Sequence, residues 1–230
     1  MNEVLKGKNC LITGATGALG GSLAKKLMNQ GCNLFLTGTD EEKLSELART
    51  LGVCYKKADL GDPSQVKHII DEVIRSEMQI DILVNSAGVF NIGDMDEKVF
   101  EHMMNVNVHA PYILCQFFSD LMKKRRWGRI VNVGSSSSYS GFKGGTSYCT
   151  TKHAILGLSR SLHEDLKDYG VQISCVSPGS MKSEMAKISV DQDFETFLEP
   201  EDVADQIVNV LSMPESMICN ELRLNRTIIR

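Results

Sequence analysis

Short apolar runs alternate with longer amphipathic segments along the whole chain. Seven runs predict strands, at residues 9–14, 33–38, 53–58, 80–88, 129–134, 171–177 and 219–225. Most of these runs are apolar nearly throughout, which is typical of parallel strands that are buried on both faces. The segments between the strands predict helices. The sequence therefore predicts an α/β fold, a doubly wound parallel sheet of about seven strands with helices on both faces.

No repeat, linker or change of composition divides the chain. Its 230 residues, of which 42% are hydrophobic and 23% charged, fit one soluble domain over residues 1–230. The formal net charge of −4 gives no general attraction to nucleic acid or to an anionic membrane. We expect neither as a partner.

The seven cysteines are scattered and never spaced C-x-x-C. They predict small buried hydrophobic side chains in a reducing compartment, and they indicate no metal site. The first residues lack the apolar stretch of a signal peptide, and nowhere do eighteen apolar residues follow one another. These patterns predict a cytoplasmic protein.

A glycine-rich phrase, TGATGALG at residues 13–20, follows the first predicted strand. Gly14, Gly17 and Gly20 would let the backbone turn tightly and approach a pyrophosphate at the start of the next helix. A tight strand–helix turn alone would also use glycine. The position of the phrase, between a first strand and a helix, favours dinucleotide binding.

The pattern Tyr-x-x-x-Lys occurs twice, at Tyr139/Lys143 and at Tyr148/Lys152. Residues four apart share one face of a helix. Three glycines in five residues make a helix unfavourable around the first pair. The second pair opens a segment with no glycine until Gly157. The sequence thus predicts the second pair on the first turns of a helix and the first pair in a loop.

A tyrosine beside a lysine can exchange protons near neutral pH. A positive charge about 4 Å away, at an effective dielectric of about 20, lowers the tyrosine pKa from about 10 by about three units. Burial opposes part of that lowering. The spacing alone favours a surface pair with no function.

Six short motifs occur in one order along the chain. They are TGATGALG (13–20), ADL (58–60), NSAG (85–88), NVNV (105–108), SYCTTK (147–152) and SPGSMKS (177–183). Together they make nearly the whole chain resemble the single-domain short-chain dehydrogenases/reductases, and among these the 3-oxoacyl-acyl carrier protein reductases. The resemblance implies a Rossmann-type fold and an NAD(P)(H)-dependent oxidoreductase that interconverts a ketone and a secondary alcohol, with a 3-oxoacyl thioester as one candidate substrate.

The resemblance also implies four catalytic residues. Tyr148 would be the general acid/base, and Lys152 would tune it and hold the nicotinamide ribose. Ser135, thirteen positions before the tyrosine, would bind the substrate oxygen. Asn107 would hold a water in a proton relay.

The cofactor-binding residues implied by the resemblance follow the same motifs. They are Gly14, Thr16, Gly17, Leu19 and Gly20 at the phosphates, Thr39 at the adenosine ribose, Asp59 and Leu60 at the adenine, Asn85, Ala87 and Gly88 on the ribose side, Pro178, Gly179, Met181 and Ser183 at the nicotinamide carboxamide, and Tyr148 and Lys152 beside it.

The end of the second strand bears on the choice of cofactor. NAD-using relatives place an acid there, which accepts from the ribose hydroxyls and repels a 2′-phosphate. This chain has Gly38 followed by Thr39, which favours NADP(H) over NAD(H). No Arg or Lys stands in either obvious phosphate-contacting place, and acids follow at residues 40–42.

Departures from the family pattern leave alternatives open. Ala18 stands where the family's middle glycine is usual, and the spacing of the glycines resembles the branch that acts on nucleotide sugars. A sugar or nucleotide-sugar substrate is therefore an alternative, and a non-catalytic dinucleotide-binding protein is another. The predicted substrate loops, at residues 90–95, 141–146 and 185–197, carry no decisive charge pattern.

The helix that begins near Tyr148 has two distinct lines of residues. Ile155, Leu158, Leu162, Leu166 and Tyr169 form an apolar stripe that predicts packing against the sheet, and Ala154, Gly157 and Ser161 form a line of small residues. The small line fits either an exposed face or the close approach of another helix. Family members pair this helix across a two-fold axis, so the resemblance implies a homodimer or homotetramer. The C-terminus lacks the Asp-Gly-Gly ending of many relatives.

Overall fold

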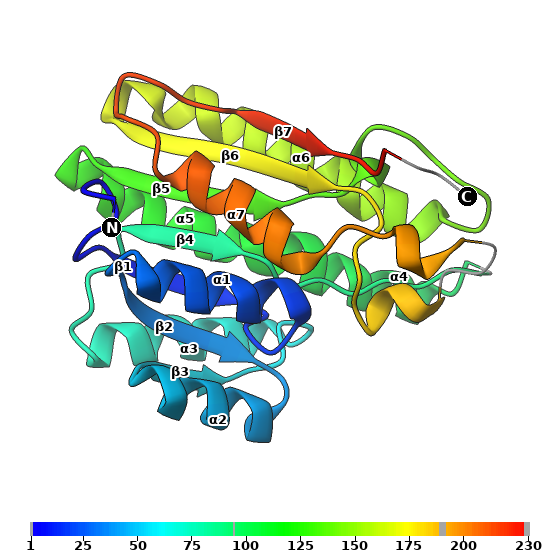
Figure 1. The fold of residues 1–230 in the computed structure, drawn as a ribbon, viewed down its shortest axis with the longest axis horizontal. Coiled ribbons are helices and arrows are strands. Elements are labelled where there is room, and N and C mark those ends of the chain that lie inside the picture. The colour runs from blue at the N-terminus through cyan, green and yellow to red at the C-terminus, as the bar shows by residue number, and fades with distance from the viewer. Residues whose placement is uncertain (1, 94, 189–191, 228–230) are drawn as a thin grey trace.

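All seven predicted strands form one parallel sheet. The computed structural model describes residues 2–93, 95–188 and 192–227. The strands are β1 (Asn9–Thr13), β2 (Asn33–Gly38), β3 (Cys54–Lys57), β4 (Ile82–Asn85), β5 (Gly128–Val133), β6 (Val171–Pro178) and β7 (Glu221–Leu224). Their order is β3-β2-β1-β4-β5-β6-β7, and every pairing is parallel (Figure 1). The doubly wound Rossmann-type sheet is confirmed.

The helices cover both faces of this sheet (Figure 1). One apolar cluster joins the sheet to α1 (Ala18–Asn29), α2 (Glu41–Leu51) and α7 (Pro200–Leu211). A second cluster on the opposite face joins it to α3 (Pro63–Arg75), α5 (Ala110–Arg125) and α6 (Thr146–Leu166). The central strands are buried from both sides, which explains why their sequences are apolar throughout.

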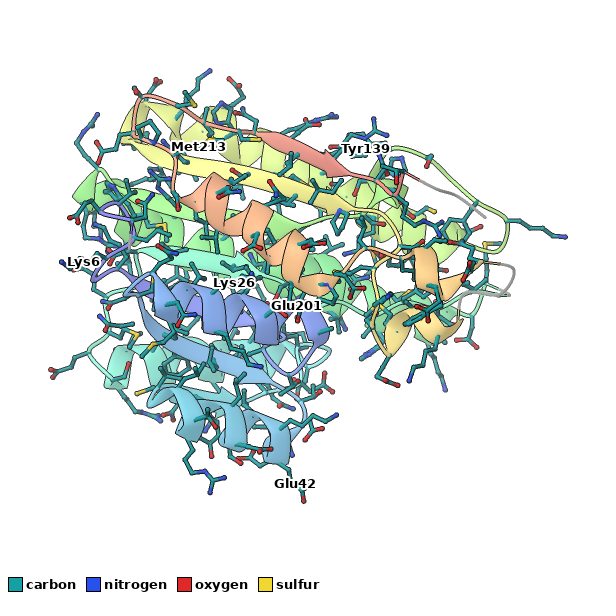
Figure 2. All side chains as sticks on the ribbon, in the orientation of Figure 1. Lys6, Lys26, Glu42, Tyr139, Glu201 and Met213 are labelled. Carbon is teal, nitrogen blue, oxygen red and sulfur yellow. The ribbon has the colours of Figure 1, made fainter. Side chains whose placement is uncertain are left out.

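Helices α1 and α7 lie side by side on the first face, although they are far apart in the sequence. Ser22 Oγ donates to Glu201 Oε1 (3.0 Å), and Lys26 Nζ pairs with Asp205 Oδ1 (2.6 Å). Figure 2 labels Lys26 and Glu201 on this pair of helices. The last helix is thereby fixed to the helix that opens the glycine-rich turn.

Capping residues set the ends of α2 and the start of α3 where the sequence places them. The Asp40 side chain accepts from the Lys43 amide, and Gly52 ends α2 in the left-handed conformation, with φ of 67°. The Asp62 side chain accepts from the Ser64 amide before Pro63, the first residue of α3. These short polar caps satisfy backbone donors that a helix start leaves free.

The long helical stretch at residues 97–125 is not one regular helix. It consists of α4 (Glu97–Met104), a π-helical turn at Asn105–His109, and α5. Pro111 at the start of α5 has no N–H to donate to the Asn107 carbonyl, and the preceding Ala110 amide bonds to Asn105 instead. The wider turn brings Asn107 to a buried position.

Helix α6 buries most of the predicted stripe, in which Leu158 and Leu162 are half-buried and Leu162 packs against the core. Ile155, Leu156 and Leu166 are buried, whereas Tyr169 is 41% exposed and lies in a 3-10 turn after the helix. The chain tightens there before Gly170, which turns the ring of Tyr169 outward beneath Lys123. The inclusion of Tyr169 in the buried stripe was therefore wrong.

Five of the seven cysteines are buried and all seven are free thiols. Cys54 is exposed because β3 is an edge strand. Over the described residues, no helix combines the length and the apolar character needed to cross a membrane.

Candidate active site

A large cleft of about 1460 Å³ opens at the carboxyl ends of the strands. The strand order reverses direction between β1 and β4, which is where folds of this kind bind ligands. Seventeen of the nineteen predicted site residues line the cleft. These are Gly14, Thr16, Gly17, Leu19, Gly20, Thr39, Asp59, Leu60, Ala87, Gly88, Ser135, Tyr148, Lys152, Pro178, Gly179, Met181 and Ser183.

The glycine-rich turn is built so that only glycine fits at two positions. Gly14 has φ of +68°, and a Cβ there would lie 2.7 Å from the Ala87 Cα. A Cβ on Gly20 would lie 2.2 Å from the Gly14 carbonyl oxygen. Helix α1 begins beside them with no side-chain cap and no acid in its first turn. Its free amides and the positive end of its dipole fit a pyrophosphate.

Thr13 ties the glycine-rich turn to the segment that follows β4, a role that the sequence did not predict. Its Oγ1 accepts from the Ala87 amide (3.1 Å), and Ser86 Oγ donates to the Thr13 carbonyl at short distance. These bonds hold the segment with Ala87 and Gly88 against the glycine turn. The signal in the sequence was a polar residue at the end of an otherwise apolar strand.

Ser135 begins a short turn directly after β5. Its side chain accepts from the Ser137 amide (3.1 Å), and its own amide donates to Ser138 Oγ (3.1 Å). This reciprocal capping fixes the 3-10 turn at Ser136–Ser138. Of the four consecutive serines, Ser135 is the one whose hydroxyl contacts Tyr148.

Tyr148 lies on the first turn of α6, as its sequence predicts. Burial raises the pKa of its phenol above the usual value, and the hydrogen bond with Ser135 offsets part of that rise. The Lys152 Nζ is 5.7 Å from the Tyr148 ring centroid. The net direction is therefore opposite to the lowering expected from the lysine, because desolvation outweighs a charge at that distance.

Lys152 is buried, with 5% of its surface exposed. Its Nζ donates to the Val133 carbonyl (3.1 Å), and burial lowers the pKa of the ammonium to about 8. A lysine held in this way points a desolvated cation into the cleft beside Tyr148. A cation there can hold ribose hydroxyls and stabilise a phenolate.

The two predicted residues that do not line the cleft are buried asparagines beneath it. Asn107 binds Val89 through both backbone groups, accepting from its amide (2.8 Å) and donating to its carbonyl (2.9 Å), and also donates to Thr151 Oγ1 (3.0 Å). Asn85 donates to Asn132 Oδ1 (2.8 Å). Both side chains thus fix the walls of the cleft from behind.

The end of the cleft predicted to hold the adenosine contains a lysine that the sequence did not single out. Lys43, on the first turn of α2, lines the cleft with Thr16 and Thr39. Its Nζ pairs with Asp40 Oδ2 (3.2 Å) and is largely exposed. At the predicted adenine position, Asp59 Oδ1 accepts from the Gly61 amide (2.8 Å) beside buried Leu60.

Two strand ends and a short lid shape the opposite side. The Gly179 amide donates to the Leu224 carbonyl (2.7 Å), which joins the end of β6 to the end of β7. Ser183 Oγ accepts from the Ala186 amide (3.1 Å) and starts the 3-10 turn at Met185–Ile188. Residues 189–191, which belong to a predicted substrate loop, lie outside the described residues, as does Asp94 of another.

Aromatic side chains form the side of the cleft that lies beside Tyr148. Phe90 packs edge-on against Tyr148, with ring centroids 4.6 Å apart, and Phe142 lies 6.3 Å from Phe90. Ile92, Met185 and Phe194 complete the apolar wall. Lys143 lies at its rim and is exposed. Within the described part of the chain, no three His, Cys, Asp or Glu side chains are arranged to hold a metal ion.

Comparisons with known proteins agree with this geometry. A family model described as short chain dehydrogenase matches residues 8–193. Nodulation protein G of Rhizobium meliloti is 36% identical over 186 residues, which cover 79% of this chain and 76% of that protein. A 3-oxoacyl-(acyl-carrier-protein) reductase of Rickettsia conorii is 30% identical over 235 residues, covering 94% of both.

Solved structures show the same fold. A short chain dehydrogenase/reductase family protein superimposes with a TM-score of 0.85 at 28% identity, covering 96% of this chain and 97% of that one. A short-chain dehydrogenase from Sphingobium yanoikuyae, solved in complex with NADPH, superimposes with a TM-score of 0.83 at 26% identity. The match covers 95% of this chain and 87% of that one. With its glycine turn and its Ser135–Tyr148–Lys152 group in one cleft, the chain belongs to the short-chain dehydrogenase/reductase family and is an NAD(P)-dependent oxidoreductase.

Proposed function

We propose that the protein is an NADPH-dependent ketone reductase and that Ser135, Tyr148 and Lys152 are its catalytic residues. The observation that carries this proposal is the meeting of these three side chains in the same cleft as the glycine turn. When bound, the nicotinamide supplies the hydride that reduces the carbonyl carbon. The Tyr148 phenol, which burial keeps protonated, donates its proton to the carbonyl oxygen, and the Ser135 hydroxyl holds that oxygen in place.

Lys152 and Asn107 support this chemistry in different ways. The Lys152 ammonium stabilises the phenolate that remains after proton transfer and would hold the ribose. Asn107 fixes Val89 beside Gly88, and we retain for it the relay role that the family resemblance implies. Asn85 donates to Asn132 and so joins the carboxyl end of β4 to β5. It would therefore affect cofactor binding only indirectly, by fixing the end of β4.

NADP(H) is the proposed cofactor. No acid stands at Gly38 or Thr39, and the hydroxyls of Thr16 and Thr39 line the adenosine end together with Lys43. Lys43 supplies the positive charge that a 2′-phosphate requires, although Asp40 shares it. The preference over NAD(H) should therefore be modest.

A 3-oxoacyl thioester is the proposed substrate class. The wall of Phe90, Phe142 and Met185 fits an apolar acyl chain beside Tyr148. Besides Lys152, four lysines line the cleft: Lys43, Lys182 and Lys187 pair with acids, whereas Lys143 has no ionic partner among the described residues. Lys143 is thus available to an anionic group on a thioester carrier. A 3-oxoacyl-(acyl-carrier-protein) reductase is among the relatives.

The test is a screen of NADPH oxidation against three classes of ketone. Acetoacetyl-coenzyme A should be reduced with a higher kcat/KM than keto sugars or steroid ketones. Preferential reduction of a keto sugar or nucleotide sugar would favour the alternative substrate. Tight NADPH binding with no oxidation by any ketone would favour a non-catalytic dinucleotide-binding protein.

We further propose that the chain acts as one domain, in the cytoplasm, as a homodimer or homotetramer. Buried free thiols support a reducing compartment. The exposed small residues on α6 support a helix-to-helix contact between copies.

A further inference from the structure

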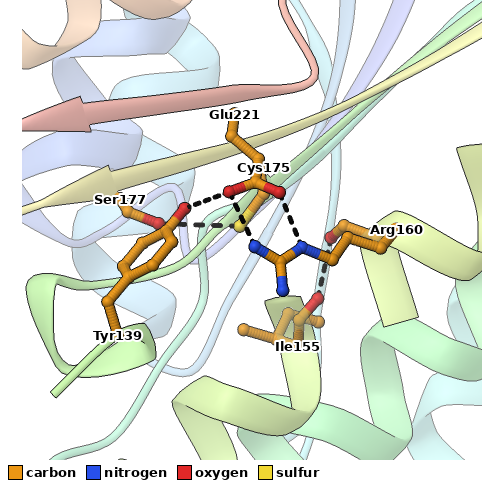
Figure 3. Close-up of polar contacts among 7 residues, drawn as sticks. Tyr139, Ile155, Arg160, Cys175, Ser177 and Glu221 are labelled. Atoms are coloured by element: carbon orange, nitrogen blue, oxygen red, sulfur yellow. Dashed lines mark hydrogen bonds and ion pairs between the residues drawn. The ribbon is translucent and has the colours of Figure 1, made fainter. Parts of the chain in front are cut away.

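Tyr139, from the first Tyr-x-x-x-Lys pair, belongs to a polar network next to the active site (Figure 3). Its Oη donates to Glu221 Oε2 (2.8 Å). Arg160 grips the same carboxylate with two bonds, from Nε to Oε1 (2.6 Å) and from Nη2 to Oε2 (3.1 Å). The Arg223 guanidinium lies 4.2 Å from the Tyr139 ring centroid. One carboxylate on β7 thus holds both a loop tyrosine and a helix arginine.

Both partners of Glu221 are connected to catalytic side chains. Tyr139 ends the short turn that begins at Ser135, and its amide donates to the Ser136 carbonyl (3.2 Å). Arg160 lies on α6, twelve residues after Tyr148. The carboxylate therefore links the turn that carries Ser135 to the helix that carries Tyr148.

The turn needs such an anchor. A 3-10 turn of three residues has weaker hydrogen bonds than an α-helix, and the chain after Tyr139 is exposed at Ser140, Gly141 and Phe142. The charged Glu221 provides stronger bonds than a neutral acceptor would. Arg160 and then Tyr139 lower the Glu221 pKa, so the carboxylate stays ionised at neutral pH.

Tyr139 is suited to anchor the turn and unsuited to acid/base chemistry. Burial and the bond to Glu221 raise the pKa of its phenol, so it remains a donor at neutral pH. Its oxygen is committed to the carboxylate. The two tyrosines of the repeated pattern therefore differ in what their oxygens contact, one a carboxylate and the other Ser135.

We infer that the Tyr139–Glu221–Arg160 network positions Ser135 against Tyr148. This inference rests on the roles proposed above for those two residues. Tyr139 and Glu221 are positioning residues, because they act through the turn and through α6. Loosening the network weakens the Ser135–Tyr148 contact, which slows proton transfer and removes the hydrogen bond that holds down the Tyr148 pKa.

The test compares four single variants with the unmodified protein: Tyr139→Phe, Glu221→Gln, Tyr148→Phe, and Glu164→Gln as the matched control. Like Glu221, Glu164 is a carboxylate that pairs with a cation, here Lys167. Glu164 lies on α6, the helix of Arg160, but its ion pair does not contact the turn at Ser136–Ser138. Reduction of acetoacetyl-coenzyme A by NADPH is measured across pH, together with the NADPH Kd and the Tm. Tyrosinate absorbance is titrated in each variant with and without Tyr148→Phe, which isolates the Tyr148 titration without any substrate.

Tyr139→Phe and Glu221→Gln should lower kcat about five-fold, the equivalent of one hydrogen bond. In both, the alkaline limb of kcat/KM and the Tyr148 titration should move to higher pH, while the NADPH Kd stays unchanged and Glu164→Gln behaves as the unmodified protein. A lower Tm with an unmoved Tyr148 titration would reduce the network to a merely structural role and overturn the inference. Full activity in Tyr148→Phe would overturn the proposed function itself.

Discussion

At the residue scale, Tyr148 is governed by two opposing effects. Burial keeps its phenol protonated, and the contact with Ser135 favours the phenolate that forms once the proton has left. A protonated phenol is the form that reduction requires. The raised pKa therefore suits a reductase at neutral pH, and the oxidation of an alcohol by the same site should become faster as the pH rises.

Removing the Tyr148 hydroxyl should abolish proton transfer and little else. We expect Tyr148→Phe to lower kcat/KM for ketone reduction by about 10³-fold, a typical value for a general acid. The NADPH Kd should remain within about two-fold of its original value, because the phosphate and adenine contacts lie on other elements. Steady-state kinetics and calorimetry measure the two quantities. Tyr139→Phe, by comparison, should keep substantial activity.

The buried Lys152 ammonium, which the proposed function requires, should lower the stability of the folded protein. Its pKa is lowered from 10.5 to about 8, so the folded state binds this proton more weakly than the unfolded state does. That difference disfavours the folded state by about 3 kcal/mol below pH 8, and the penalty disappears as the pH rises from 8 to 10.5.

We expect Lys152→Met to lose activity and to raise the Tm at neutral pH by about 9 °C, at about 3 °C for each kcal/mol in a chain of this length. The gain should vanish above about pH 10.5, where the lysine is neutral in both states. Thermal unfolding at several pH values measures it, with Lys25→Met on the exposed face of α1 as the control. A Lys152→Met protein that is less stable than the original at pH 7 would contradict the assigned burial penalty.

The sequence identified the side chains that line the cleft better than those that support them. Ser135, Tyr148 and Lys152 were singled out by the family resemblance that the six motifs carry, and all three line the cleft. The supporting bonds of Thr13 and Glu221 connect residues 74 and 82 positions apart, and no local pattern encodes such a partner. The direction of the Tyr148 pKa was also missed, because desolvation depends on the whole cleft.

At the scale of elements, the strand pattern was sufficient to predict the sheet. Continuous apolar runs fixed the strands, and Asp40, Gly52 and Asp62 fixed helix ends through local hydrogen bonds. The π-helical turn at Asn105–His109 was not predicted, although Pro111 follows it closely in the sequence. A proline on the first turn of a helix normally marks a clean start, and only the packed structure shows that the helix continues through it.

The loop between β2 and α2 should determine cofactor preference. NADPH should bind more tightly than NADH by about ten-fold, because Lys43 offers one shared charge to the 2′-phosphate. Lys43→Gln should bring the two affinities together, and Gly38→Asp should reverse the order by repelling the phosphate. Calorimetry with each cofactor measures these affinities.

A matched control separates charge from size at Gly38. A Cβ there would lie 2.9 Å from Thr16 Oγ1, so any substitution must turn the Thr16 side chain. Gly38→Asn introduces the same bulk without charge and should weaken both cofactors equally. Equal affinity of the unmodified protein for NADPH and NADH would refute the proposed NADP(H) preference.

At the scale of the whole molecule, α6 would connect the proposed catalysis to the proposed assembly. Its buried side holds Lys152 and Ile155 against the sheet, and its opposite side exposes the small residues Gly157 and Ser161. A Cβ on Gly157 would meet no atom of the described residues within 4 Å. Intramolecular packing therefore gives no reason for a glycine there, since glycine in a helix interior costs about 1 kcal/mol relative to alanine. A second helix that approaches closely across a two-fold axis gives such a reason.

Substitutions at Gly157 distinguish a monomer from a dimer built on α6. In a monomer, both Gly157→Ala and Gly157→Arg should raise the Tm slightly, because each residue favours the helix by about 1 kcal/mol and neither meets a neighbour. In a dimer, alanine should be tolerated, whereas arginine should dissociate the protein and lower its activity by loosening the helix that carries Tyr148. Sedimentation at micromolar concentration measures the assembly, and kcat and Tm follow in parallel. We expect the dimer pattern. An unmodified protein that sediments as a monomer, with Gly157→Arg more stable and equally active, would show that the small residues of α6 are an ordinary exposed face.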